Sequence, residues 1–322
     1  MMRSAFVLGL LGLAAATGLF IWHGAQPVFD AFAAAGWVTV GIALLHFLSM
    51  ALNARSWQIL LPPPKRPTTA FFLWAVWLRE AVNGLLPVAR IGGEVVTARL
   101  LMGWGLGSAS SVASLIADVT VTLGSQLIFT LIGIALLLLH QNDNPIIRQS
   151  LIGVLIFIPL LGGFFLVQRK GVFGMLSKIS QKVFGDRFVS LASNAAALDC
   201  KIRRLYRRRS AVVACLLWQV AGWCAGGIEI WAGLQALGHP ASLTDGIIIE
   251  SLIQALSSSA FIVPGALGVQ EGGFMLLGSL LGINADTALA LALIRRARDI
   301  LLFVPALAFW QISLGHRWLK SN

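Results

Sequence analysis

A stretch of twelve residues, 262–273, most constrains the fold of this chain, because it places four glycines, a proline and a carboxylate between apolar flanks. Pro264 removes a backbone donor and the glycines loosen the chain, so we expect any helix to break here. Inside a membrane a broken helix is tolerated only where protein buries it or where it lines a watery cavity. A carboxylate at such a place, Glu271, is costly and marks function by default.

Residues 87–94 repeat this pattern. Pro87 precedes Glu94 by seven positions, as Pro264 precedes Glu271, and the two copies are offset by 177 residues. Two interrupted apolar segments at matching positions of two halves indicate the binding site of a transporter. The alternative is a chance recurrence in a glycine-rich chain, which the flanking segments can test.

The composition is that of a helical integral membrane protein. The 322 residues are 57% hydrophobic and only 11% charged, with a mean hydropathy of +0.83. A soluble domain carries about 25% charged residues. The net charge is +11, but 11 of the 24 Lys and Arg residues lie between positions 169 and 209. This surplus therefore indicates topology and a membrane surface, and nucleic acid is not an expected partner.

Six apolar segments are long enough to cross a membrane as helices. Two further apolar regions, 69–107 and 246–283, contain the interrupted stretches, and we expect each to form a re-entrant pair of half-helices. The predicted fold is an all-α polytopic membrane protein with six spanning helices and two re-entrant broken-helix regions. The predicted spans are residues 5–22, 37–61, 110–139, 146–167, 211–237 and 286–315.

The distribution of Lys and Arg predicts the orientation. The turn at 62–68, the segment 168–210 and both termini are basic and are expected in the cytoplasm. The loops 140–145 and 238–245 lack Lys and Arg and are expected outside. The two interrupted regions would then enter the membrane from opposite sides.

The 177-residue offset also relates the flanking spans. It carries 37–61 onto 214–238 and 110–139 onto 287–316, which are close to two other predicted spans. The agreement favours an inverted-topology repeat over chance. We therefore expect one transmembrane domain with a first half at 1–139 and a second half at 146–315.

The segment 168–210 is expected to be an interfacial region on the cytoplasmic surface. Its first part, 172–191, has apolar residues at near-helical spacing beside lysines, which is typical of a helix lying on an anionic leaflet. Two roles stay open. The segment can be a positive-inside anchor alone, or it can also gather lipid headgroups.

The candidate site consists of polar residues and prolines in or beside the interrupted regions. Glu94 and Glu271 are expected to anchor the broken segments, and the charged residues to line or lock a headgroup path. For each ion pair the alternative is structural charge pairing without transport. The candidate residues are Arg79, Glu80, Asn83, Pro87, Arg90, Glu94, Arg99, Asp118, Pro264, Gln270, Glu271, Arg295, Arg298 and Asp299.

Asp118 and Arg295 are related by the same offset of 177 residues. Across a pseudo-two-fold axis they would face each other, and opposite charges buried there would pair. The alternative is that Arg295 pairs with Asp299 one turn away, and Asp118 with Arg99 or Arg90.

No cofactor, metal site or catalytic residue is predicted. The five histidines are scattered, and neither a nucleophile triad nor a nucleotide-binding loop appears. Cys200, Cys215 and Cys224 fit neither a disulfide nor a zinc spacing and are interpreted as packing residues.

Residues 264–273, with 82–94 upstream, resemble the flippase-like membrane domain of the lysylphosphatidylglycerol synthase/flippase family. Residues 83–101 and 290–299 are most similar to the branch associated with hopanoid biosynthesis. The resemblance covers essentially the whole chain and implies movement of an amphipathic lipid across a bacterial inner membrane. The family's soluble aminoacyl-transferase domain is absent from the sequence, which argues against lysine transfer.

The expected function is therefore a lipid flippase or transporter of the inner membrane, moving a hopanoid or an anionic or aminoacylated phospholipid. One alternative is a membrane enzyme, or partner of an enzyme, that modifies a lipid headgroup. Another is a scaffold that holds lipid-biosynthesis proteins together. A flippase changes the leaflet distribution of a lipid without changing its chemistry, an enzyme changes the chemistry, and a scaffold tolerates loss of its buried charges.

Overall fold

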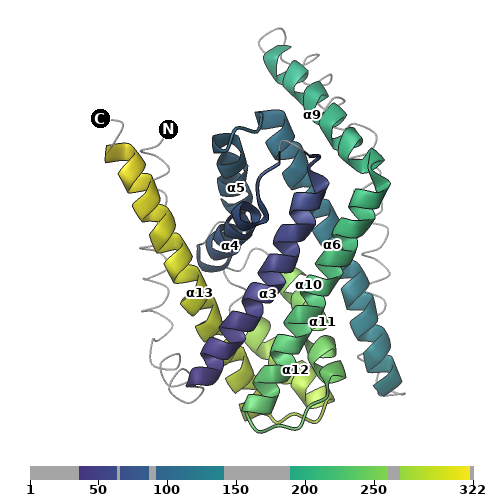
Figure 1. The fold of residues 1–322 in the computed structure, drawn as a ribbon. Coiled ribbons are helices and arrows are strands. Elements are labelled where there is room, and N and C mark those ends of the chain that lie inside the picture. The colour runs from purple at the N-terminus through teal and green to yellow at the C-terminus, as the bar shows by residue number, and fades with distance from the viewer. Residues whose placement is uncertain (1–35, 64–65, 87–91, 141–188, 260–268, 320–322) are drawn as a thin grey trace. The chain divides into compact units, whose positions relative to one another are not determined.

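The computed structural model describes residues 36–63, 66–86, 92–140, 189–259 and 269–319, and every regular element in these ranges is an α-helix (Figure 1). Three of these helices contain stretches long and apolar enough to cross a membrane: Trp37–Leu60, Ser108–Leu139 and Arg209–Ala236. They form α3 (Trp37–Leu60), most of α6 (Ser108–His140) and α10 (Arg209–Ala236). The all-helical membrane fold is confirmed. The predicted spans 5–22 and 146–167 lie outside the described residues.

Helix α13 (Ala285–Leu319) covers the last predicted span and is 35 residues long. Its first half carries four charged residues within five positions, 295–299, which sets it apart from the three apolar helices. Its apolar positions Ala297, Leu302 and Ala306 are buried. The helix is therefore held by packing on its apolar side while it carries several charges.

Each interrupted region contains two short helices. The first has α4 (Thr69–Leu85) and α5 (Gly92–Gly103), of 17 and 12 residues. The second has α11 (Leu243–Ser259) and α12 (Val269–Leu280), again of 17 and 12 residues. The predicted breaks at 87–91 and 260–268 lie outside the described residues, and re-entry into the membrane stays a prediction.

The described part of the basic segment forms α9 (Val189–Arg207), a helix that packs against α6. Its side chains are divided between two faces, with Ile202 and Leu205 buried and Lys201, Arg203 and Arg204 exposed. The period of these residues is helical, so the basic side chains share the face away from the apolar contact. The spacing of apolar residues predicted a helix only in the first part of the segment, residues 172–191.

The chain divides into two compact units. Unit 1 comprises residues 1–50, 74–97 and 223–322, and unit 2 comprises 51–73 and 98–222. Each unit takes segments from both predicted sequence halves, because long helices such as α3 and α10 contribute residues to both units.

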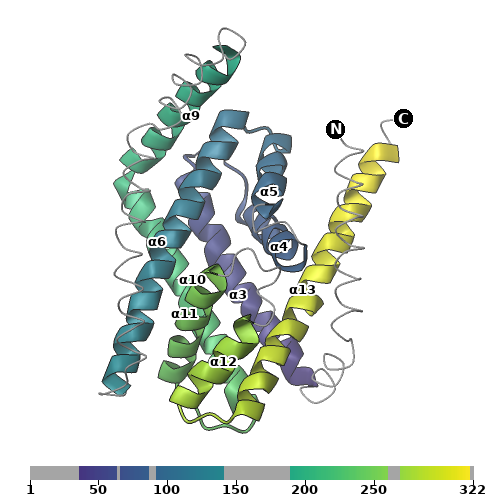
Figure 2. The same cartoon turned by 180° about the vertical axis from the view of Figure 1, so that it is seen from behind.

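In unit 1 the helix α12 packs against α11 and α13, as both views show (Figures 1 and 2). The core at this place is built from Leu234, Ile249, Ile253, Phe274 and Leu291. Burial of such aliphatic and aromatic side chains holds the short helix α12 in place, because its 12 residues could not form a stable isolated helix.

In unit 2 the C-terminal half of α3 is fixed by aromatic and polar contacts. Trp57 is fully buried and meets Phe72 edge-on, with ring centroids 5.2 Å apart. The hydroxyl of Ser56 donates to the carbonyl of Cys215 at 2.9 Å, which joins α3 to α10. Cys215 is buried and acts here as a packing residue with a polar neighbour.

Candidate functional site

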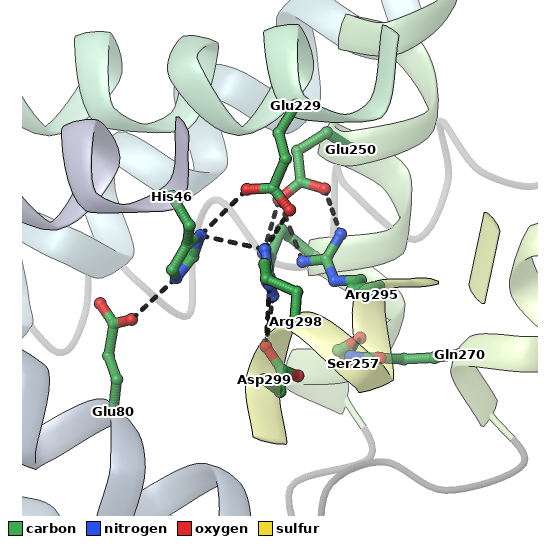
Figure 3. A network of polar contacts seen from close by, with 10 residues as sticks. His46, Glu80, Glu229, Glu250, Ser257, Gln270, Arg295, Arg298 and Asp299 are labelled. Atoms are coloured by element: carbon green, nitrogen blue, oxygen red, sulfur yellow. Dashed lines mark hydrogen bonds and ion pairs between the residues drawn. The ribbon is translucent and has the colours of Figure 1, made fainter. Parts of the chain in front are cut away.

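His46, on α3, lies at the centre of a polar cluster in unit 1 (Figure 3). Its Nε2 lies 3.1 Å from Oε2 of Glu80 on α4, and its Nδ1 lies 3.0 Å from Oε2 of Glu229 on α10. Nη1 of Arg298 on α13 lies 3.0 Å from the same Nδ1. Phe303 packs against the ring edge-on, with centroids 6.3 Å apart. One imidazole therefore connects four helices.

Arg298 joins two carboxylates. Its Nη1 donates to Oε1 of Glu229, and its Nε and Nη2 donate to Oδ1 of Asp299 at 3.0 and 2.5 Å. The side chains of Arg298 and Glu229 are 4% and 3% exposed. A buried guanidinium at this depth is stable only because its donors meet charged acceptors.

Arg295, one turn earlier on α13, pairs with Glu250 on α11. Its Nη1 donates to Oε2 and its Nη2 donates to Oε1 at 3.2 Å, so the contact is bidentate. The amide of Gln254 donates to Oε1 of Glu250 at 2.7 Å, and the guanidinium lies 6.0 Å from the ring centroid of Phe274. This pair is almost fully enclosed by protein.

Glycines on α10 and α11 allow Glu250 to reach this position. A methyl group on Gly246 would lie 2.4 Å from the carbonyl oxygen of Gly227, so only glycine permits this approach of the two helices. A methyl group on Gly226 would lie 3.0 Å from Oε1 of Glu250. Small residues at such a crossing bring helix backbones together in membrane proteins. Here they also leave space for a buried carboxylate.

We call this cluster the ion network. Its ion-pairing side chains contain four carboxylates, two guanidiniums and one imidazole, so negative charge exceeds the fixed positive charge. Glu80 and Asp299 are 27% and 22% exposed, so solvent screens part of this excess, and a proton on the imidazole would reduce it further. The members are His46, Glu80, Glu229, Glu250, Arg295, Arg298 and Asp299.

Four of the predicted site residues, Glu80, Arg295, Arg298 and Asp299, belong to the ion network. The three others, His46, Glu229 and Glu250, were not among the predicted site residues. Each is an ionisable residue in a mostly apolar segment, and this was the only signal the sequence carried. Their roles depend on partners from other helices, which no local pattern reveals.

Asn83 and Glu94 form a second contact in unit 1, between α4 and the first turn of α5. The Asn83 amide nitrogen lies 3.3 and 3.2 Å from the two Glu94 oxygens, and Asn83 Oδ1 accepts from the Gly93 N–H at 2.9 Å. A methyl group on Gly93 would lie 2.6 Å from the carbonyl oxygen of Arg79. Asn83 thus anchors the N-terminus of α5, and Glu94 lies where the helix dipole favours a carboxylate.

Glu271 and Gln270 anchor the other short helix, α12. Nε of Arg296 donates to Oε1 of Glu271 at 2.9 Å, which joins α13 to the first turn of α12. The amide of Gln270 donates to the Ser257 hydroxyl at 3.0 Å, which joins α12 to α11. The role predicted for Glu94 and Glu271, anchoring the two broken segments, stays a prediction. The predicted site residues Pro87, Arg90 and Pro264 lie outside the described residues.

Asp118 and Arg99 belong to unit 2. The Asp118 side chain is fully buried and accepts a hydrogen bond from the Gln219 amide at 3.4 Å, while the same amide donates to Thr122 at 3.0 Å. Arg99 is exposed. Arg295 has its partner, Glu250, within unit 1, so neither the Asp118 nor the Asp299 pairing is needed to neutralise it.

The part of the chain that the structure describes can also be compared with the requirements of a metal site. No group of three or more His, Cys, Asp or Glu side chains is arranged there to hold a metal ion. The ion network satisfies its carboxylates with guanidiniums and an imidazole instead.

These features define a multi-pass α-helical membrane protein with charged residues buried among its helices. The chain belongs to the family of the lysylphosphatidylglycerol synthase transmembrane region, whose family model matches residues 9–306. This family is associated with lipid flipping, and only its transmembrane region, without a synthase domain, is detected in the chain.

A relative of similar length is a "UPF0104 membrane protein" of Methanothermobacter thermautotrophicus. It is 23% identical over 329 aligned positions, which cover 97% of this chain and 94% of the relative. No solved structure matches the chain. Neither the family match nor this relative distinguishes a hopanoid-associated branch.

Proposed function

We propose that this protein moves a polar-headed lipid between the leaflets of the bacterial inner membrane, and that the ion network controls the movement. The observation that carries the proposal is a network of seven ionisable side chains, four of them buried, among helices of a family associated with lipid flipping. Charged groups at such depth are rare and typically belong to substrate or ion pathways.

The bounds of the helices support an inverted-topology repeat as the framework for this movement. Adding 177 to the bounds of α5, 92 and 103, gives 269 and 280, which are the bounds of α12. Adding 177 to 108, where α6 begins, gives 285, where α13 begins. We propose that α4–α5 and α11–α12 are the two re-entrant pairs of this repeat, as in transporters that expose one site alternately to each side.

The proposed orientation places α9 in the cytoplasm, because its exposed face is rich in Lys and Arg. Cys200 on α9 is exposed and provides a natural reporter. In intact cells we expect a membrane-impermeant maleimide to leave Cys200 unlabelled, and in inverted membrane vesicles to label it. A cysteine at His239, between α10 and α11, should show the opposite pattern in a Cys200→Ser background. Labelling of Cys200 from outside would refute the orientation and with it the proposed repeat.

The function is tested with purified protein in vesicles that contain fluorescent lipids. Three cargoes are compared: phosphatidylglycerol, lysylphosphatidylglycerol and a hopanoid with a polar headgroup. The fluorophore in the outer leaflet is reduced with dithionite, and the time course reports how quickly lipid arrives from the inner leaflet. We expect at least one of the three lipids to move between the leaflets faster in vesicles with the protein than in protein-free vesicles.

The same assay separates the alternatives and identifies the cargo. Unchanged lipid masses after the reaction support transport, whereas a new lipid mass would indicate an enzyme. Acceleration of the hopanoid alone would support the hopanoid as cargo, and acceleration of the phospholipids alone would exclude it. No acceleration of any of the three lipids would contradict the proposed function.

A further inference from the structure

We propose that His46 is the proton-binding site that couples this protein to a transmembrane pH gradient. The inference rests on the proposed function, lipid movement, and adds the driving ion. It is carried by the position of one imidazole between two carboxylates and a guanidinium, each from a different helix.

The partners of Nδ1 require opposite protonation states. Oε2 of Glu229, 3.0 Å away, is an acceptor and requires a proton on Nδ1. Nη1 of Arg298, also 3.0 Å away, is a donor and requires a lone pair on Nδ1. A neutral ring with its proton on Nε2 satisfies Arg298 and Glu80. A doubly protonated ring satisfies Glu80 and Glu229.

The two states therefore differ by one proton and by one hydrogen bond. When His46 takes up a proton, Nδ1 stops accepting from Arg298 and donates to Glu229. When it releases the proton, the contact with Arg298 returns. Because His46 is on α3 and Arg298 is on α13, the protonation state decides whether these two helices are joined directly. This is a two-state element of the kind that ion coupling requires.

Glu80 holds the Nε2 proton in both protonation states. Its side chain is 27% exposed, whereas that of Glu229 is 3% exposed, and the two lie on opposite nitrogens of the imidazole. One proton from water adds to the lone pair of Nδ1, which then donates to Glu229. Release of that proton to water restores the neutral ring.

The surrounding charges favour uptake of one proton. Glu80 on α4, Glu229 on α10 and Arg298 on α13 contact the ring, and Asp299 and the Glu250–Arg295 pair lie beside these residues (Figure 3). With a neutral ring the ion network has four carboxylates against two guanidiniums. A proton on His46 reduces this excess from two negative charges to one.

The proton site is tested directly by nitrogen NMR of the protein labelled with ¹⁵N-histidine. The signals of His46 are identified by their absence from the His46→Gln variant. His239→Gln, which changes a histidine outside the ion network, is the control. Between about pH 5 and about pH 10 we expect both ring nitrogens of His46 to be protonated at the acidic end and one to lose its proton as the pH rises. A ring that keeps one protonation state throughout would overturn the inference.

Coupling is tested in vesicles with a pH difference across the membrane. One proton per lipid corresponds to a change of about tenfold in the leaflet ratio per pH unit. We expect the wild-type protein and His239→Gln to approach this ratio and His46→Gln to leave it near one. A wild-type leaflet ratio that ignores the gradient, or a His46→Gln ratio that follows it, would refute the coupling.

The two measurements distinguish failure of the inference from failure of the proposed function. If the wild-type protein moves none of the lipids, the proposed function fails, and the NMR result still shows whether His46 exchanges a proton. If His46→Gln moves no lipid in any condition, a gradient response of the wild-type protein together with the NMR titration supports the inference. Absence of the titration contradicts it.

Discussion

Replacing Arg295 by glutamine is expected to lower the free energy of unfolding by about 3–5 kcal/mol, because it leaves the buried Glu250 carboxylate without its guanidinium. Glu250→Gln should have a comparable effect through the unpaired Arg295. The double variant should lose much less, since neither charge remains to be buried alone. Reversible unfolding in mixed micelles, monitored by circular dichroism, measures all three differences.

The two single variants and the double variant form a double-mutant cycle, which also tests which carboxylate pairs with Arg295. The sequence offset predicts coupling between Arg295 and Asp118, and the helix period offers Asp299 as an alternative. The bidentate contact in unit 1 predicts coupling with Glu250. Parallel cycles with Asp118→Asn and Asp299→Asn are the controls. Additive losses for Glu250 and Arg295, with coupling in one of the parallel cycles, would contradict the pairing described here.

Replacing Arg298 by glutamine is expected to be equally damaging, with a loss of about 3–5 kcal/mol in stability. The substitution removes the guanidinium from Glu229, which is 3% exposed, and from Asp299 at the same time. Lipid movement should also be lost, because Arg298 is the donor that competes for His46. The dithionite assay and the unfolding measurement together report both effects.

Two variants serve as controls for Arg298. Arg298→Lys keeps the positive charge, but an ammonium group lacks the planar guanidinium that donates to Glu229 and Asp299 together. We therefore expect Arg298→Lys to recover only part of the stability and lipid movement that Arg298→Gln loses. Asp299→Asn removes a carboxylate that is 22% exposed, so solvent screening should limit its cost to below about 1 kcal/mol. If Arg298→Gln were no more damaging than Asp299→Asn, the Glu229 contact would not be important for stability.

The short helices show how local chemistry guides a prediction. Glu94 and Glu271 were predicted to anchor the two broken segments, and they lie in the first turns of α5 and α12. The breaks were predicted because proline and glycine disfavour a continuous helix, and the glutamates because a carboxylate inside a membrane is costly. The predicted breaks lie outside the described residues, so the anchoring role stays a prediction. The described part of the basic segment, α9, was not predicted to be helical, since its apolar positions become interpretable only once α6 covers them.

The ion network shows where sequence reasoning stops. A helical period identifies neighbours three or four positions apart, and it offered Asp299 as a partner for Arg295. The actual partner, Glu250, is 45 positions away, and Arg298 reaches Glu229 across 69 positions and His46 across 252. Such contacts depend on how helices cross, which glycines on α10 and α11 determine through backbone approach.

The sequence by itself determined the membrane class, the helical fold and the three apolar spans that the structure describes. These are properties of composition and of short-range backbone chemistry, which require no knowledge of partners. Only the tertiary structure decided which buried charges neutralise one another and that His46 stands between them. The reason is that the energy of a buried charge depends on the few ångströms to its nearest partner, and helices distant in sequence supply that partner.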